Sequence, residues 1–139
     1  MIIAVDFDGT IVEHEYPEIG RPKLFVFETL KAMQEQGHQL ILWTYRAGKE
    51  LDEAVGYCKR NGVEFYAVNK NYPEEVYDDT ISRKIMADIY IDDRNVGGFI
   101  SWSEIWQMLN PDLFDDNVKN QMKRIPVKKK SFWQKLKRN

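Results

Sequence analysis

Short apolar runs separated by longer polar segments dominate the first hundred residues of the chain. Runs that are apolar throughout, rather than alternating with polar residues, are typical of buried parallel strands. Two such runs occupy residues 2–5 and 39–43, and residues 63–68 and 87–91 are expected to form the third and fourth strands. The pattern therefore predicts a parallel sheet of four strands.

Helical periods fill most of the intervals between these runs. One apolar stripe stops at Gly37 and another stops at Gly62, and glycine commonly terminates helices. The stripes consist of Val26, Phe27, Leu30 and Met33, and of Leu51, Ala54, Val55 and Cys58. A third helix is expected to begin after Ser101, which forms a capping box with Glu104, and to end before Pro111. The alternation predicts a three-layer α/β/α, Rossmann-like fold with helices on both faces and right-handed crossovers.

Composition narrows the class of protein. The chain has 139 residues, of which 43% are hydrophobic and 30% charged, as expected for one globular domain. The single cysteine, Cys58, excludes an internal disulfide, and no apolar run approaches the roughly 20 residues of a membrane span. We therefore expect a cytoplasmic protein without a transmembrane segment.

The net charge of −2 is the sum of two opposite segments. All 22 acidic residues lie at or before Asp116, so residues 1–118 carry −11 and residues 119–139 carry +9. We expect residues 1–118 to form a single folded core and residues 119–139 a flexible basic tail. Nucleic acid or an anionic surface is a candidate partner for this tail. A solubilising arm, or a segment that folds back onto the acidic core, is the favoured interpretation, because charge alone is not specific.

Polar residues directly follow each predicted strand. In strand order they are Asp6 and Asp8, then Thr44, then Asn69 and Lys70, and finally Asp92 and Asp93. The carboxyl ends of parallel strands meet at one edge of a sheet, where ligands bind. Carboxylates that converge there repel one another unless a cation neutralises them. The sequence therefore predicts a metal site at this edge.

These residues resemble, in order, the four motifs of the haloacid dehalogenase superfamily. The first motif is Asp6-Phe7-Asp8-Gly9-Thr10, the second is Thr44, the third is Lys84, and the fourth is Asp92-Asp93. The resemblance covers about residues 1–109. It implies a Mg²⁺-dependent phosphohydrolase with a Rossmann-like fold.

The resemblance also implies a role for each motif residue. Asp6 is the expected nucleophile, which forms an aspartyl-phosphate, and Asp8 is the expected general acid and base. Thr44 would bind a phosphate oxygen, and Lys84, or its neighbour Arg83, would place positive charge against the phosphoryl group. The expected Mg²⁺ ligands are Asp6, Asp8, Asp92 and Asp93, the last directly or through water. Asp88, within the last strand, is expected to be structural.

The spacing between motifs leaves no room for a cap domain. Asp8 and Thr44 are 36 residues apart and Thr44 and Lys84 are 40 apart, whereas an independent insert needs roughly 50 residues beyond the core elements. A flap at residues 11–21 and a loop at residues 69–80 would shape the site instead. The expected substrate contacts are Gly9, Thr10, His14, Tyr16, Tyr45, Arg46, Lys70 and Tyr72. The phosphorylated substrate is then a small molecule, a macromolecule that covers the site, or one enclosed by a second subunit of a homo-oligomer.

Three other functional classes are alternatives to a phosphohydrolase. A receiver domain of two-component signalling shares the residue inventory, but its order of motifs differs from the order in this chain. A phosphonatase or dehalogenase belongs to the same superfamily, but the Asp8 acid/base and the acidic pair favour phosphate esters. The remaining alternative is a catalytically idle phosphate- or nucleotide-binding module whose basic tail recruits a partner.

Overall fold

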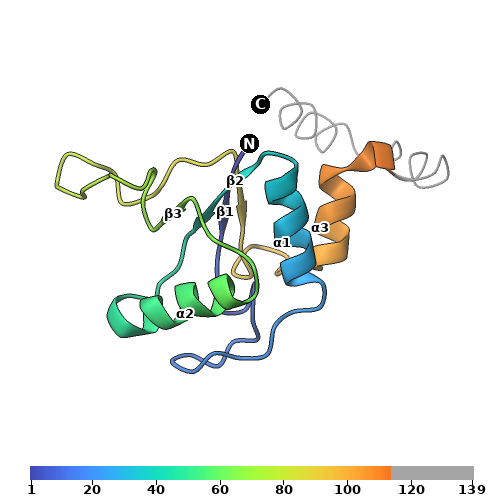
Figure 1. Ribbon diagram of the computed structural model, residues 1–139, viewed down its shortest axis with the longest axis horizontal. Helices are drawn as coiled ribbons and strands as arrows, with labels where there is room; N and C mark the ends of the chain where they lie inside the picture. Colours follow the sequence, from blue (N-terminus) through green and yellow to red (C-terminus); the bar gives the residue numbers. More distant parts are fainter. Residues whose placement is uncertain (114–139) are drawn as a thin grey trace. The chain divides into compact units, whose positions relative to one another are not determined.

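The structure is a computed structural model that describes residues 1–113 (Figure 1). The chain divides into two compact units, Met1–Phe99 and Ile100–Asn139. The boundary between these units lies before the third helix, and the expected single core of residues 1–118 stays a prediction. Gly97 and Gly98 just precede the boundary with positive φ angles of 95° and 78°, a conformation that glycine adopts more readily than other residues. The predicted tail, residues 119–139, lies outside the described residues.

The first unit contains a four-stranded parallel sheet with the strand order β3-β2-β1-β4. The strands are β1 (Ile2–Val5), β2 (Gln39–Leu42), β3 (Ala67–Val68) and β4 (Ile89–Ile91). The central strand β1 pairs on both sides, so that Ala4 lies between Ile41 and Tyr90. The predicted α/β Rossmann-like fold with a parallel sheet is confirmed.

The two outer strands are shorter than predicted from the sequence. Only Ala67 and Val68 of the predicted run 63–68 pair with β2, because the chain reaches the sheet late after α2. Val63 is buried, but its N–H group donates to the carbonyl of Cys58 at the end of the preceding helix. Asp88 precedes β4 and accepts a hydrogen bond of 2.7 Å from the N–H group of Ile2.

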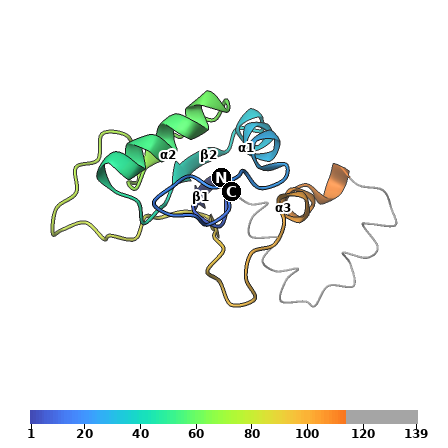
Figure 2. The same ribbon diagram turned by 90° about the horizontal axis from the view of Figure 1, so that it is seen from below.

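Two helices cover one face of this sheet, as Figure 2 shows. They are α1 (Val26–Glu35) and α2 (Gly48–Arg60). Both crossovers move in the same direction, from β1 to β2 and on to β3, so right-handed connections place both helices on the same side. The other face carries no helix from residues 1–99. There Ile85, from the β3–β4 connection, packs in a buried cluster with Ala4, Ile41 and Ala67.

The predicted flap at residues 11–21 has a buried base and an exposed tip. Ile11 and Val12 are fully buried, and Val12 pairs with Pro22 in an antiparallel bridge. His14 and Tyr16 lie at the exposed tip. The apolar base anchors the flap in the core while its polar tip remains beside the carboxyl edge of the sheet.

The described part of the second unit holds α3 (Trp102–Leu109) and the 3₁₀ turn η1 (Pro111–Leu113). The predicted capping box is confirmed. The N–H group of Glu104 donates to the Ser101 hydroxyl at 3.3 Å, and the N–H group of Ser101 donates to the Glu104 carboxylate at 3.2 Å. No helix within residues 1–113 is long and apolar enough to cross a membrane.

Candidate functional site

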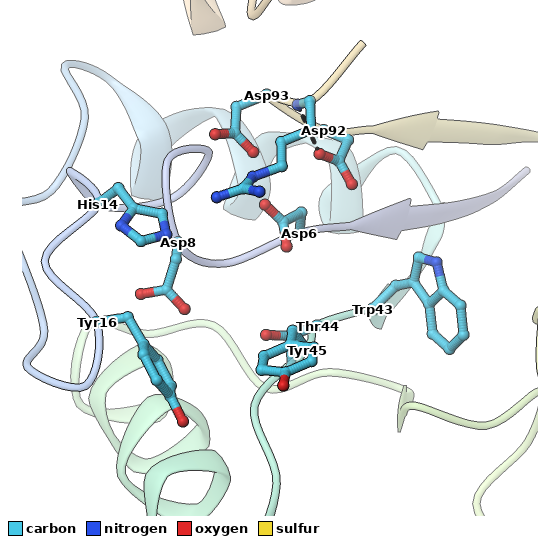
Figure 3. Close-up of a pocket in the computed structure, with 10 residues that line it drawn as sticks. Asp6, Asp8, His14, Tyr16, Trp43, Thr44, Tyr45, Asp92 and Asp93 are labelled. Carbon is cyan, nitrogen blue, oxygen red and sulfur yellow. Dashed lines mark hydrogen bonds between the residues drawn. The ribbon is translucent and has the colours of Figure 1, made fainter.

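A cavity of about 650 Å³ opens at the carboxyl ends of β1, β2 and β4 (Figure 3). Its walls come from the loops that follow these strands and from the flap. The lining residues are Asp6, Asp8, His14, Tyr16, Trp43, Thr44, Tyr45, Asp92, Asp93 and Arg94. The parallel topology thus brings the loops after strands one, two and four to one place, as expected for an open α/β sheet.

Three partly buried carboxylates converge in this cavity. Asp6, Asp92 and Asp93 each offer one oxygen, and these oxygens lie within 4.8 Å of one another. Figure 3 shows Asp6 leaving the end of β1 and the acidic pair leaving the end of β4. Burial, the charge of Asp92 and the contact with Asp93 raise the pKa of Asp6 from 3.8 to about 7. A hydrogen bond of 3.0 Å from the Thr10 hydroxyl to Asp6 acts against this rise in pKa.

The surroundings of Asp93 fit a bound divalent cation. Its Oδ1 atom is buried and has no hydrogen-bond partner within the described residues. Gly9 has a φ of 84°, and a Cβ atom at this position would overlap the Asp93 carboxylate. A buried, unpaired carboxylate oxygen is costly unless a counter-ion satisfies it, and hard cations such as Mg²⁺ prefer carboxylate ligands. Asp6, Asp92 and Asp93 therefore suit Mg²⁺.

Asp8 does not join this cluster. Its carboxylate forms a bidentate ion pair with Arg46, with Nε to Oδ2 and Nη2 to Oδ1 distances of 2.8 Å each. The structure does not bring the Asp8 carboxylate into the cluster of Asp6, Asp92 and Asp93, because it is held against the Arg46 guanidinium instead. Asp8 still lines the cavity, so its predicted role in proton transfer remains a prediction.

Arg46 is buried and fully hydrogen-bonded. Its guanidinium also donates to the carbonyl oxygens of Pro17, Glu18 and Glu50, so each of its five N–H groups has an acceptor. Its Cζ atom lies 5.0 Å from the ring centroid of Phe7 and 5.2 Å from that of Tyr16. The expectation that Arg46 contacts substrate is therefore wrong. This residue ties the flap to α2 and to Asp8.

Thr44 lines the cavity, as its position after β2 predicts. Its N–H group donates to the Asn69 side chain at 2.8 Å, and its hydroxyl accepts from the N–H group of Arg46 at 3.1 Å. Asn69 has a φ of 53°, a left-handed conformation that asparagine tolerates better than most residues. The turn after β3 thus holds the loop after β2 in place.

Four basic or aromatic residues that were predicted to contact phosphate or substrate do not line the cavity. Lys84 lies with its Nζ 4.9 Å from the centroid of the Tyr90 ring, and the Nζ of Lys70 donates to the carbonyl of Pro73 at 3.3 Å. The other two are Arg83 and Tyr72. Their expected contact with the phosphate or substrate is not met, because the long β3–β4 connection anchors itself through Ile85 on the other face of the sheet.

Two lining residues are additional to the predicted set. Trp43 directly precedes Thr44, and its side chain also packs against the Ala4 cluster. Arg94 follows the acidic pair, and its N–H group donates to the Asp92 carboxylate at 2.9 Å. The position of Arg94 directly after the fourth motif is the sequence feature that could have identified it as a cavity residue. Its exposed side chain brings positive charge to the cavity where Lys84 does not.

One comparison with solved structures bears on this site. The structure of a conserved protein coded by a locus of Bacteroides thetaiotaomicron is 55% identical to this chain, with a TM-score of 0.76. The similarity covers 81% of this chain and 91% of the Bacteroides chain. This chain belongs to the family of that conserved protein. Neither a protein-family model nor a curated protein matches the sequence. The Bacteroides relative thus supports the fold that positions the cavity, and the chemistry is argued from the residues.

Proposed function

We propose that the protein is a Mg²⁺-dependent phosphohydrolase of the haloacid dehalogenase type, which cleaves phosphate monoesters through an aspartyl-phosphate on Asp6. One observation carries this proposal: the carboxylates of Asp6, Asp92 and Asp93 converge in a cavity at the carboxyl edge of the sheet. The buried Oδ1 of Asp93, which has no hydrogen-bond partner within residues 1–113, supports a cation there rather than a purely structural role.

Asp6, Asp92 and Asp93 would hold the Mg²⁺ ion. When bound, this ion supplies the positive charge that allows an anionic carboxylate to approach an anionic phosphate. The raised pKa of Asp6, about 7, reflects burial and repulsion by its acidic neighbours, and the nucleophile must be ionised to attack. The three-carboxylate arrangement therefore explains why activity should depend on the metal.

Asp6 acts on the phosphorus atom. A bond forms between a carboxylate oxygen of Asp6 and phosphorus, the bond from phosphorus to the ester oxygen breaks, and the leaving oxygen takes a proton. The Thr10 hydroxyl orients the Asp6 carboxylate, and Thr44 and Arg94 bind the phosphoryl oxygens from the cavity wall. Water then hydrolyses the aspartyl-phosphate, which releases phosphate and restores Asp6.

Asp8 transfers the proton in both steps, and Arg46 orients it. The two hydrogen bonds from Arg46 use one lone pair on each Asp8 oxygen, so each oxygen retains a second lone pair for a proton. A carboxylate held by a buried guanidinium cannot rotate freely. This restriction supports Asp8 as a positioned acid and base.

A panel of phosphate monoesters, assayed with Mg²⁺ and with a chelator, tests the proposal. We expect turnover that disappears with the chelator and falls at least about a thousandfold in Asp6→Asn, because the amide is not a nucleophile. Asp52→Asn, an exposed aspartate of α2 outside the cavity, is the matched control and should retain full activity. Equal activity of wild type and Asp6→Asn would contradict the mechanism.

The second candidate is a catalytically idle phosphate-binding module. The absence of Lys84 from the residues that line the cavity favours it, since the third motif is then unused. The same panel separates the two functions. Binding of phosphate that requires Mg²⁺, without turnover of any ester, would favour the module.

The remaining proposals concern the setting of the reaction. We propose a cytoplasmic enzyme whose site is completed by its substrate or by a second subunit, because the spacing between the motifs leaves no room for a cap domain. Binding of nucleic acid or an anionic surface by the basic residues 119–139 is the less favoured role for that segment.

A further inference from the structure

We propose that the substrate is a nucleoside monophosphate, whose base stacks on Tyr45 at the mouth of the cavity. This inference rests on the proposed phosphohydrolase activity and names its class of substrate. It is drawn from the aromatic side chains beside the phosphate site.

Tyr45 is an exposed ring next to the proposed phosphate contact. It directly follows Thr44 and lines the same cavity, yet its side chain is 92% exposed. A large ring packed against so little of its own protein contributes little to stability, and aromatic rings at a cavity rim are typical of ligand contacts. Figure 3 shows Tyr45 on the side of the cavity away from Asp92 and Asp93.

Tyr16 forms the second wall beside this ring. The centroids of the two rings lie 6.3 Å apart, and their planes meet at 72°. The guanidinium of Arg46 lies over the ring of Tyr16 and also binds the flap carbonyls of Pro17 and Glu18. Tyr16 is therefore held in place with one face occupied, while Tyr45 keeps its faces open. The two rings form a corner into which a planar group can enter and stack on Tyr45.

The difference in burial between Asp6 and Tyr45 favours a nucleotide over an aryl phosphate. Asp6 is partly buried at the end of β1, whereas Tyr45 is open to solvent. In phosphotyrosine the ring is attached directly to the ester oxygen, so it would lie beside Asp6. In a nucleoside monophosphate the ribose separates the phosphate from the base. A cavity of about 650 Å³ is large enough for such a ligand, because small-molecule sites measure about 300–1,000 Å³.

The experiment compares two esters that differ only in the base. Adenosine 5′-monophosphate and methyl riboside 5-phosphate share the same primary phosphate ester, so a ratio of their kcat/KM values isolates the contribution of the base. We expect a ratio of about 5 to 150 in favour of the nucleotide, which is the range for stacking of one base on an aromatic side chain. Tyr45→Ala should bring the ratio close to one, and Tyr45→Phe should preserve it.

Tyr77→Ala is the matched control, since Tyr77 is 54% exposed and lies outside the residues that line the cavity. It should preserve the ratio. A wild-type ratio near one, or a high ratio that survives Tyr45→Ala, overturns the inference and leaves the phosphohydrolase intact. Loss of phosphotyrosine turnover in Tyr45→Ala, with nucleotide turnover unchanged, assigns the ring to an aryl phosphate and also overturns it. No turnover of any ester overturns the proposed function and this inference with it.

Discussion

Asp8 and Arg46 are joined by a bidentate ion pair in which both N···O distances are 2.8 Å. The two residues are 38 positions apart in the chain, and each belongs to a loop that follows a central strand. The Arg46 side chain is fully buried and that of Asp8 is 12% exposed. The pair therefore links the loops after β1 and β2, and the flap bonded to the same guanidinium, into one structural unit.

Replacing Arg46 with alanine should destabilise the protein strongly. The substitution leaves the Asp8 carboxylate and three backbone carbonyls without their donor, and breaking a buried pair costs about 3–5 kcal/mol. Arg46→Lys keeps the charge but loses the bidentate geometry, so a smaller loss is expected. Urea unfolding measures both changes. Arg21→Ala, at an exposed position, should change the free energy of unfolding by less than about 0.5 kcal/mol. An Arg46→Ala protein as stable as wild type would show that the pair is not structural.

Mg²⁺ should stabilise the protein more at alkaline than at acidic pH. The pKa of Asp6 is about 7 in the folded state and 3.8 is its ordinary value, so the folded protein binds the proton more tightly. The contribution of Asp6 to stability is thus complete below 3.8 and is lost as the pH rises through about 7. A bound cation offsets this loss by neutralising the ionised carboxylate.

Thermal unfolding with and without Mg²⁺, at about pH 5 and about pH 8, measures this linkage. The increase in Tm caused by Mg²⁺ should be larger at the higher pH. Without Mg²⁺, the Tm of Asp6→Asn should depend less on pH than the Tm of wild type. The contribution of Asp6 to this dependence disappears because the amide does not titrate. Equal stabilisation by Mg²⁺ at both pH values would argue against a cation at Asp6.

Gly9→Ala should weaken Mg²⁺ binding, whereas Gly37→Ala should not. Both glycines have a positive φ, 84° and 88°, so both substitutions carry backbone strain of about 1–3 kcal/mol. At Gly9 the new Cβ atom would meet the Asp93 carboxylate. At Gly37 no atom lies within 4 Å of the new Cβ atom. Calorimetric titration of Mg²⁺ should show an affinity at least about tenfold lower for Gly9→Ala alone. Similar affinities in the two variants would exclude Asp93 as a ligand at this site.

Arg94→Ala should reduce phosphatase activity more than Lys84→Ala does. Arg94 lines the cavity, and a guanidinium that pairs with a phosphate contributes about 1.5–3 kcal/mol, or roughly a tenfold to hundredfold change in kcat/KM. Lys84 lies against the Tyr90 ring and outside the cavity lining, so it serves as the matched cation. Steady-state kinetics with one phosphate monoester give kcat/KM for wild type and for both variants. A larger effect at Lys84 would mean that the β3–β4 connection moves Lys84 into the site during catalysis.

The elements of the fold could be predicted from the sequence because the signals that define them are local. Apolar runs marked the strands, and the 3.6-residue period with a terminal glycine marked α1 and α2. The Ser101 capping box depends on a spacing of three residues, and it formed as predicted. The convergence of Asp6 with Asp92 and Asp93 also followed, because parallel strands bring their carboxyl ends to one edge.

The tertiary structure alone decided which basic side chains lie at the site. Arg46 is adjacent to the second motif and was expected to contact substrate, but its five N–H groups donate to Asp8, Pro17 and Glu18, which are distant in the chain, and to the nearby Glu50. Lys84 was assigned from the order of motifs, but the path of the β3–β4 connection takes it to Tyr90. The sequence by itself determined which residues stand at the ends of the strands, since strand patterns and parallel topology are regular. It could not determine the partners of long side chains in irregular loops, because those depend on where remote carbonyls and carboxylates come together.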